Sequence, residues 1–379
     1  MSTPFLSTDF TFGVEFEFGI RFKKGSFPDY RKLGPETLIV ETGLEVLTEA
    51  EIVRESPHFS NRNEDPNKIH QQDLFNTWAI GTDATISFHA EEHADRSSMF
   101  VELELITPVM KFGPKALKDI DKMLTAFEKH FNVVVNQSCG LHVHVGNGTK
   151  GLSFEPFQYL MATIWIFEPQ IFSLLRKSRN NGRYCGSLHK RSNLGVYKFK
   201  GNLLDVLFST SDINEVVGMF DGYDSFSYMA FKLQYLLQPF PHPVKRTIEF
   251  RAHEGSMDSE TVLNWVAFVV ELVSWAHKIN RQHLKIFLSK HIDSKDLSIE
   301  DLFKEIGFPQ STIEFYREKF KILRQVEKKE AEEKRAIKKK KAEERKARDA
   351  ARAAGEIVDS SNSSKDSSMD TLESGSFVF

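Results

Sequence analysis

Four short segments place charged or imidazole side chains at every second position, between aliphatic or aromatic residues. Because successive side chains of a β-strand point to opposite faces, each segment predicts a strand with one apolar and one functional face. The residues on the functional faces are Glu15 and Glu17, Glu102 and Glu104, His142 and His144, and Glu249 and Arg251. If the strands pair in one sheet, five carboxylates and two imidazoles converge near one guanidinium.

Polar-out alternation also occurs on ordinary solvated sheet faces, and that interpretation suffices for any one of these strands alone. Solvated faces, however, usually mix in Thr, Lys, Gln and Ser, and none of these is among the eight residues. Clustered carboxylates either raise one another's pKa or require cations, and Mg²⁺ with oxygen ligands meets that requirement. Arg251 presents a fork of donors that matches phosphate oxygens, so the set favours a triphosphate together with its metal.

The His142-x-His144 pair alone fits a zinc site on a strand equally well. Three common motifs are missing from the sequence, namely Gly-x-x-x-x-Gly-Lys-Ser/Thr, Gly-x-Gly-x-x-Gly and Gly-x-Ser-x-Gly. Their absence excludes P-loop and Rossmann phosphate sites and the nucleophile elbow of an α/β-hydrolase.

The same segments resemble the amidoligase family of carboxylate–amine ligases. The resemblance rests on Gly13-Val14-Glu15-Phe16-Glu17, Glu104-Leu105-Ile106-Thr107-Pro108, Ser138-Cys139-Gly140-Leu141-His142-Val143-His144-Val145-Gly146, and Thr247-Ile248-Glu249-Phe250-Arg251 with Gly255-Ser256-Met257-Asp258. It extends from Thr11 to Lys278, in the family's order. It implies the catalytic fold shared with glutamine synthetase and glutamate–cysteine ligase, a curved antiparallel sheet with helices packed on one face.

The resemblance also implies roles for individual residues. The metal ligands would be Glu15, Glu17, Glu104 and Glu249. His142 would lie at the phosphate and the metal, His144 would assist in binding the nucleotide, and Arg251 would hold the γ-phosphate. Arg183 lies in a basic stretch, residues 179–185, that resembles a family segment; it would bind substrate or phosphate, with a plain basic loop as the alternative. Glu102 is additional to the family pattern.

The expected activity is that of a ligase that depends on ATP and on Mg²⁺ or Mn²⁺. It would join a carboxylate to an amine through an acyl phosphate, with Arg251, His142 and Glu249 as its catalytic residues. The amine and carboxylate substrates could be small molecules, peptides or protein side chains. Two alternatives stay open: a zinc-dependent hydrolase that uses His142 and His144, and a catalytically inactive binding protein of the same fold.

The elements around these segments predict an α+β fold, because strands and helices alternate without the regularity of βαβ units. Expected strands are Phe10–Phe18, Trp78–Phe88, Phe100–Thr107, Val244–Ala252, and a pair formed by Asn132–Val135 and Gly140–Val145 around a turn at Asn136–Ser138. Expected helices are Glu36–Val53, Pro114–Phe131, Ser153–Leu175 with a kink at Pro169, and one that ends near Lys278 and is capped by Ser256 or Asp258. Ser56–Asp73 and Ser178–Ser192 are expected to be loops.

Charge divides the chain of 379 residues into three parts, although its net charge is only −3. Residues 1–320 carry −6 and predict one catalytic domain. Residues 321–352 hold 14 basic and 7 acidic side chains and predict a solvated charged helix, because they contain no apolar seam for a coiled coil. Residues 353–379 carry −4, are rich in Ser and predict a disordered tail.

Composition also bears on partners and location. The N-terminus shows no signal peptide, no segment reaches the length of a membrane span, and only two cysteines occur, so we expect an intracellular, cytoplasmic protein with reduced thiols and no membrane partner. A nucleic-acid partner is not expected, except through the basic helix 321–352. Lys338–Lys341 in that helix also leave nuclear import open.

Overall fold

The computed structural model describes residues 9–23, 60–61, 75–88, 97–180, 185–197, 202–222, 229–239, 245–292, 294 and 296–353. The expected helix Glu36–Val53, most of the expected loop Ser56–Asp73, Arg183, and the tail after residue 353 therefore lie outside the described residues. The chain divides into two compact units, residues 1–323 and residues 324–379. The sheet and all elements around the candidate site belong to the first unit.

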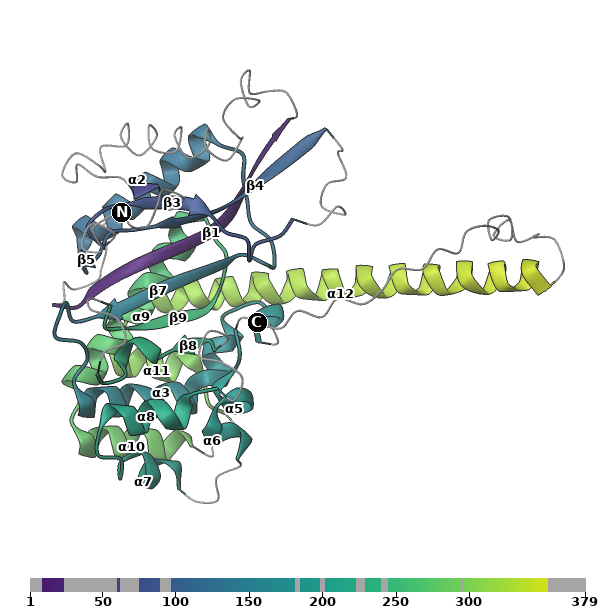
Figure 1. Ribbon diagram of the computed structural model, residues 1–379. Helices are drawn as coiled ribbons and strands as arrows, with labels where there is room; N and C mark the ends of the chain where they lie inside the picture. The colour runs from purple at the N-terminus through teal and green to yellow at the C-terminus, as the bar shows by residue number, and fades with distance from the viewer. Residues whose placement is uncertain are drawn as a thin grey trace, which may run out of the picture. The chain divides into compact units, whose positions relative to one another are not determined.

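Nine strands form one open sheet in the described part of the first unit (Figure 1). They are β1 (Thr11–Lys23), β2 (Ser60–Asn61), β3 (Ala79–Thr82), β4 (Ser98–Ile106), β5 (Met110–Lys111), β6 (Val133–Val134), β7 (Gly140–Gly146), β8 (Phe231–Lys232) and β9 (Thr247–Glu254). The order across the sheet is β2-β3-β4-β1-β7-β9-β8, with β5 and β6 also paired to β1. Every pair is antiparallel except β2 with β3, so the α+β prediction is confirmed.

Helices surround the sheet on its apolar side and extend below it in Figure 1. In chain order they are α2 (Pro114–His130), α3 (Phe154–Ser173), α4 (Lys177–Asn180), α5 (Leu188–Arg191), α6 (Asn193–Val196), α7 (Leu203–Leu207), α8 (Ile213–Phe220), the 3₁₀ turn η3 (Gln234–Leu236), α9 (Ser259–Lys278), α10 (Arg281–His291), α11 (Ile299–Ile306) and α12 (Gln310–Ala353). None of the described helices is long and apolar enough to cross a membrane.

One hydrophobic core joins the strands to the helices. Phe16 of β1, Leu105 of β4 and Val143 of β7 are almost fully buried there, against residues of α2, α3 and α9. The α9 helix starts where the sequence predicts, because the Asp258 carboxylate accepts a hydrogen bond from the Thr261 amide at 2.8 Å. Since alternate residues of these strands enter this core, the intervening polar residues lie together on the opposite face of the sheet.

Three predicted elements differ from the structure. The strand expected over Trp78–Phe88 ends at Thr82, and Asp83–Phe88 runs on without regular structure. The strands expected to pair with each other around Asn136–Ser138 instead follow one another along the same edge of β1, where β6 faces Gly19–Ile20 and β7 faces Thr11–Phe16. The turn between them therefore connects two strands that pair with the same edge of β1, and it does not form a hairpin.

The third difference concerns the loop expected over Ser178–Ser192, which contains the short helix α5 and the end of α4. Glu168, a buried residue of α3, explains α5. Its carboxylate accepts hydrogen bonds from the Ser187 hydroxyl at 2.6 Å and from the His189 amide at 3.0 Å, at the start of that helix. A buried acid in a distant helix supplies the N-terminal partner that the local sequence lacks.

Candidate active site

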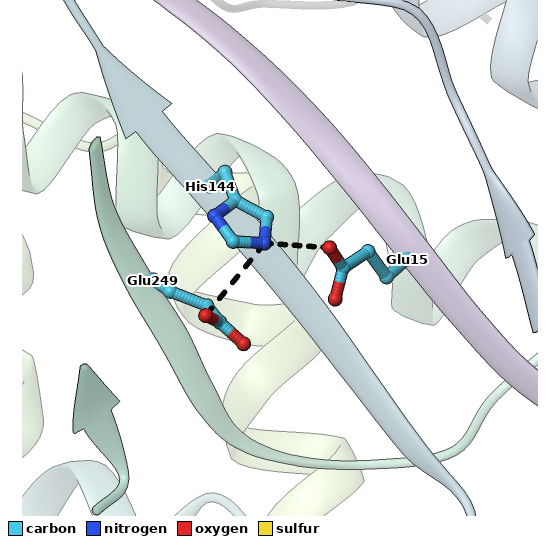
Figure 2. A group of neighbouring side chains, drawn as sticks. All are labelled: Glu15, His144 and Glu249. Atoms are coloured by element: carbon cyan, nitrogen blue, oxygen red, sulfur yellow. Dashed lines mark hydrogen bonds and ion pairs between the residues drawn. The ribbon is translucent and has the colours of Figure 1, made fainter. Parts of the chain in front are cut away.

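The polar face of the sheet brings Glu15, His144 and Glu249 together from three neighbouring strands (Figure 2). The His144 imidazole Nε2 lies 2.9 Å from Glu15 Oε1 and 3.9 Å from Glu249 Oε2. Its other nitrogen, Nδ1, lies 3.2 Å from the Thr247 hydroxyl, which fixes the ring. One ligand atom from each of the three residues lies within 4.8 Å of the others, a spacing that could hold a metal ion. We name these three residues the first ligand group.

A second ligand group consists of Glu17, Asp83 and Glu104, whose carboxylate oxygens also lie within 4.8 Å of one another. Glu17 and Glu104 are direct cross-strand partners in the β1–β4 register. Glu17 is further held by the Gly140 amide, which donates a 2.6 Å hydrogen bond to Oε2. Asp83 follows β3 and was not singled out in the sequence, where no alternation marks it.

His142 lies between the two ligand groups. Its Nδ1 is 3.4 Å from Glu15 Oε2 and 3.7 Å from Glu249 Oε1, and its Nε2 is 3.6 Å from Glu17 Oε1. The ring is buried, and Glu15 is its direct cross-strand partner in the β1–β7 register. The His142 imidazole therefore contacts acids of both groups. A change in the charge or position of either group can reach the other group through this ring.

Three cations lie close to the first ligand group. Arg251 Nη1 donates a 2.7 Å hydrogen bond to Glu249 Oε1. Lys232 Nζ is 3.4 Å from Glu249 Oε2, and Lys245 Nζ is 3.6 Å from Glu15 Oε1. The sequence interpretation counted only Arg251. Lys245 shares the alternation of Thr247 and Glu249, which could have revealed it, whereas Lys232 lies on a strand of two residues that carries no pattern.

These charges set the protonation of the first ligand group. Burial opposes ionisation of Glu15, but the charges of His144 and Lys245 and hydrogen bonds from His142 and His144 outweigh it and hold its pKa well below the usual range. Burial likewise opposes ionisation of Glu249, yet neighbouring cations lower its pKa to about 2. Burial and Lys245 lower the pKa of His144 in spite of the two acids. At neutral pH the group thus offers two carboxylates and a neutral imidazole, the forms that bind metals.

Residues Asp83–Phe88 cross the polar face beside the second ligand group, and we name them the bridging segment. At its start, the Asp83 amide donates to the Glu102 carbonyl at 3.3 Å. At its end, the Ser87 amide donates to the Ser138 hydroxyl at 3.0 Å, and the Phe88 ring stacks on Phe100 with centroids 5.1 Å apart. The segment therefore runs from β4 to the turn after β6, and it positions Asp83.

Of the two remaining predicted residues, Glu102 and Arg183, the structure describes only Glu102. Glu102 is half-buried on the same strand as Glu104 and belongs to neither ligand group. Arg183 lies outside the described residues, but Arg179 from the same basic stretch is buried and donates to the Arg251 carbonyl at 2.8 Å and the Ala252 carbonyl at 3.3 Å. Arg179 thus supports the β9 backbone where the strand bulges.

An open, mostly antiparallel sheet whose polar face carries two candidate ligand groups and an arginine defines an α+β protein with a candidate metal-dependent active site. The model of the family described as "putative amidoligase enzyme" matches residues 8–273, well over half of the chain, and the chain belongs to that family. The family resemblance inferred from the four strands is thereby confirmed. No match is found among curated proteins. The matched range contains the whole sheet and both ligand groups and ends before α12 begins.

Proposed function

We propose that the protein is an ATP- and Mg²⁺-dependent carboxylate–amine ligase, with a catalytic fold like that of glutamine synthetase. Membership of the amidoligase family indicates an amide-bond ligase. The observation that carries the finer proposal is the arrangement on the polar face, where two ligand groups flank His142 and Arg251 contacts the first of them.

The chemistry of the ligand groups fits Mg²⁺ or Mn²⁺ better than zinc. The second group offers only carboxylate oxygens, and the first offers two carboxylates with a single imidazole. Hard divalent ions prefer such oxygen-rich sites, whereas zinc sites favour imidazole and thiolate ligands. Glu15, His144 and Glu249 would hold one ion, and Glu17, Asp83 and Glu104 would hold a second.

The cations nearby fit a triphosphate. Arg251 uses one guanidinium nitrogen for Glu249, while its Nε is buried without a hydrogen-bond partner in the described structure. A buried donor without an acceptor is costly, and a phosphate oxygen would satisfy it. Lys232 and Lys245, whose ammonium groups lie 5.1 Å and 4.6 Å from the Tyr235 ring centroid, add positive charge on the same side.

These charges support the following proposed reaction. A carboxylate oxygen of one substrate attacks the γ-phosphorus of ATP, ADP leaves, and an acyl phosphate results. The amine nitrogen of the second substrate then attacks the acyl carbon, phosphate leaves, and the nitrogen loses a proton to give the amide. Arg251 would stabilise the phosphoryl group in transfer and His142 would lie at the phosphate, while Mg²⁺ held by the two ligand groups would supply charge neutralisation of the triphosphate.

The test is release of ADP and phosphate by the purified chain. We expect turnover only when ATP, Mg²⁺, a carboxylate and an amine are all supplied, measured across panels of amino acids and peptides. Glu15→Gln and Arg251→Ala should each reduce turnover at least about a hundredfold. The matched controls Glu102→Gln and Arg317→Ala, the latter an exposed arginine paired with Glu300, should retain it. Full turnover in the Glu15 and Arg251 variants would contradict the proposed site.

Metal analysis separates the two alternatives. Tightly bound zinc without affinity for ATP would favour a hydrolase that uses His142 and His144. Binding of ATP and Mg²⁺ with no turnover on any substrate pair would favour an inactive binding protein of the same fold.

A further inference from the structure

The second unit carries a charge pattern that the ligase proposal does not use. Within the predicted charged helix, residues 321–333 hold four basic and four acidic side chains, whereas residues 334–352 hold ten basic and three acidic ones. The whole excess of +7 therefore lies in the last five turns of α12, which runs without interruption to Ala353.

The helix gathers part of this charge on one line. Residues three and four apart lie on the same face of an α-helix. Spacings of four, three, four and three residues connect Lys334, Lys338, Lys341, Arg345 and Arg348, and all five side chains are exposed. At about 1.5 Å per residue these five cations extend over about 21 Å. We name them the basic stripe.

In the described part of the helix, most cations of the basic stripe make no ion pair within 4.0 Å, whereas several cations outside the stripe do. Lys339 pairs with Glu343 and Lys340 with Glu344, each at 4.0 Å. Within the stripe Arg345 approaches Asp349 at 3.8 Å. No ion pair of the other four stripe residues occurs among the described residues 324–350. Glu333, Glu343 and Glu344 thus pair with cations outside the stripe, and the stripe keeps most of its positive charge.

The composition of this face restricts its partner. Ile337 is the one large aliphatic side chain in residues 327–350. A coiled-coil partner would need a repeating apolar seam, and a membrane surface would need an apolar face to bury, so both are disfavoured. A polymer with regularly repeated negative charge requires only cations at helical spacing, and a phosphodiester backbone is such a polymer.

We infer that the basic stripe binds the phosphodiester backbone of a nucleic acid. Lys334, Lys338, Lys341, Arg345 and Arg348 contact successive phosphates along the helix. Because these contacts are to phosphates, which carry no sequence information, binding is electrostatic and independent of base sequence. This partner is separate from the ligase substrates, because the stripe lies outside the family match.

Two variants of the full chain with equal charge and equal length test the inference. The stripe variant Lys334→Gln/Lys338→Gln/Lys341→Gln removes three stripe cations. The control variant Lys329→Gln/Lys339→Gln/Lys340→Gln removes three cations from the opposite face, which pair with Glu333, Glu343 and Glu344. Circular dichroism checks that both helices persist. The probes are a fluorescein-labelled 20-base-pair DNA duplex and the RNA duplex of the same sequence, titrated at several salt concentrations.

We expect the wild-type chain to bind at least one of the duplexes, and comparison of the two shows which nucleic acid it prefers. The stripe variant should lose at least about tenfold in affinity, and its slope of log K against log salt should fall by about 2 to 3, as expected for three lost phosphate contacts. The control variant should bind within about threefold of wild type. Equal losses in both variants, or no binding of either duplex by the full chain at low salt, would overturn the inference.

Discussion

His142 connects the two ligand groups, because its two ring nitrogens face acids of different groups. Nδ1 is turned toward Glu15 and Glu249, and Nε2 toward Glu17. A cation bound at one group would draw its carboxylates away from the ring and change what the ring offers to the other group. Metal binding at the two groups should therefore be coupled, with His142 as the common element.

Substitutions on β4 test the second ligand group. Glu104→Gln removes a carboxylate of the group, while Glu102→Gln removes one of equal charge two residues away that belongs to neither group. We expect Glu104→Gln to weaken Mn²⁺ binding by at least about tenfold and Glu102→Gln to leave it within about twofold. Titration of free Mn²⁺ by electron paramagnetic resonance measures both affinities. Equal affinities in the two variants would exclude Glu104 from the metal site.

At the residue scale, the alternation of side chains along the strands was enough to predict most of the candidate site. The alternation in β1, β4, β7 and β9 correctly placed seven of the eight highlighted side chains in contact with one another or in a ligand group, with Glu102 as the exception. Lys245 lies on the same alternation. Asp83 could not be found this way, because it reaches the site from an irregular segment whose path depends on tertiary contacts with Ser138 and Phe100.

Among the elements, the bridging segment depends on a glycine in β1. A Cβ atom added at Gly19 would lie 2.3 Å from the Phe88 ring, which leaves no room for any side chain larger than hydrogen. Phe88 belongs to a small apolar cluster with Ile86 and Cys139, separate from the main core. This cluster fixes the end of the segment and thereby the position of Asp83.

We expect Gly19→Ala to lower the free energy of unfolding by about 1 to 3 kcal/mol and to weaken Mn²⁺ binding, since Phe88 must move and the segment with it. Gly218→Ala is the matched control. Gly218 lies in α8, where an added Cβ would meet nothing within 4 Å, so this change should be neutral or stabilise by up to about 1 kcal/mol. Urea unfolding and Mn²⁺ titration measure the two effects. If the Gly19→Ala chain is destabilised but binds Mn²⁺ with unchanged affinity, the bridging segment does not position a metal ligand.

The sequence predicted the long elements better than the short ones. α2, α3 and α9 have apolar stripes or caps strong enough to specify them locally. The order β6-turn-β7 looked like a hairpin, yet both strands pair with β1, because pairing with a long central strand buries more apolar surface than pairing with each other. Likewise, the start of α5 is held by hydrogen bonds to Glu168 of α3, a distant residue that no local sequence pattern predicts.

At the scale of the whole molecule, residues 310–323 of α12 belong to the first compact unit and the rest of the helix belongs to the second. Ile313 and Tyr316 are buried, and Tyr316 packs against Phe303 with centroids 5.1 Å apart. A stop after Gln325 should change the free energy of unfolding by less than about 1 kcal/mol, whereas a stop after Gln310 should remove at least about 3 kcal/mol, since two large side chains lose their burial. Urea unfolding of both truncated chains decides the matter; equal stabilities would place the end of the domain before α12.

The stability of the whole domain should also depend on pH through His253, which lies on the core side of the sheet beyond the bulge in β9. Its Nδ1 donates to the Glu254 carbonyl at 2.6 Å, and its Nε2 lies 3.0 Å from Lys319 Nζ of α12. Its ring also packs on Trp265 of α9. Burial and the charge of Lys319 lower its pKa to about 4, against 6.5 ordinarily, in spite of the nearby Glu254.

Between pH 6.5 and pH 4 the unfolded chain binds a proton at His253 that the folded chain does not, so the free energy of unfolding falls as the pH falls. At pH 5 this one residue should account for a loss of roughly 2 kcal/mol relative to pH 7. Urea unfolding at both pH values measures the difference. Lys319→Gln should raise the pKa of His253 and reduce the loss, and His253→Gln should abolish this contribution. If both variants show the same difference between pH 7 and pH 5 as wild type, other groups govern the acid sensitivity, because a merely destabilising change shifts both values equally.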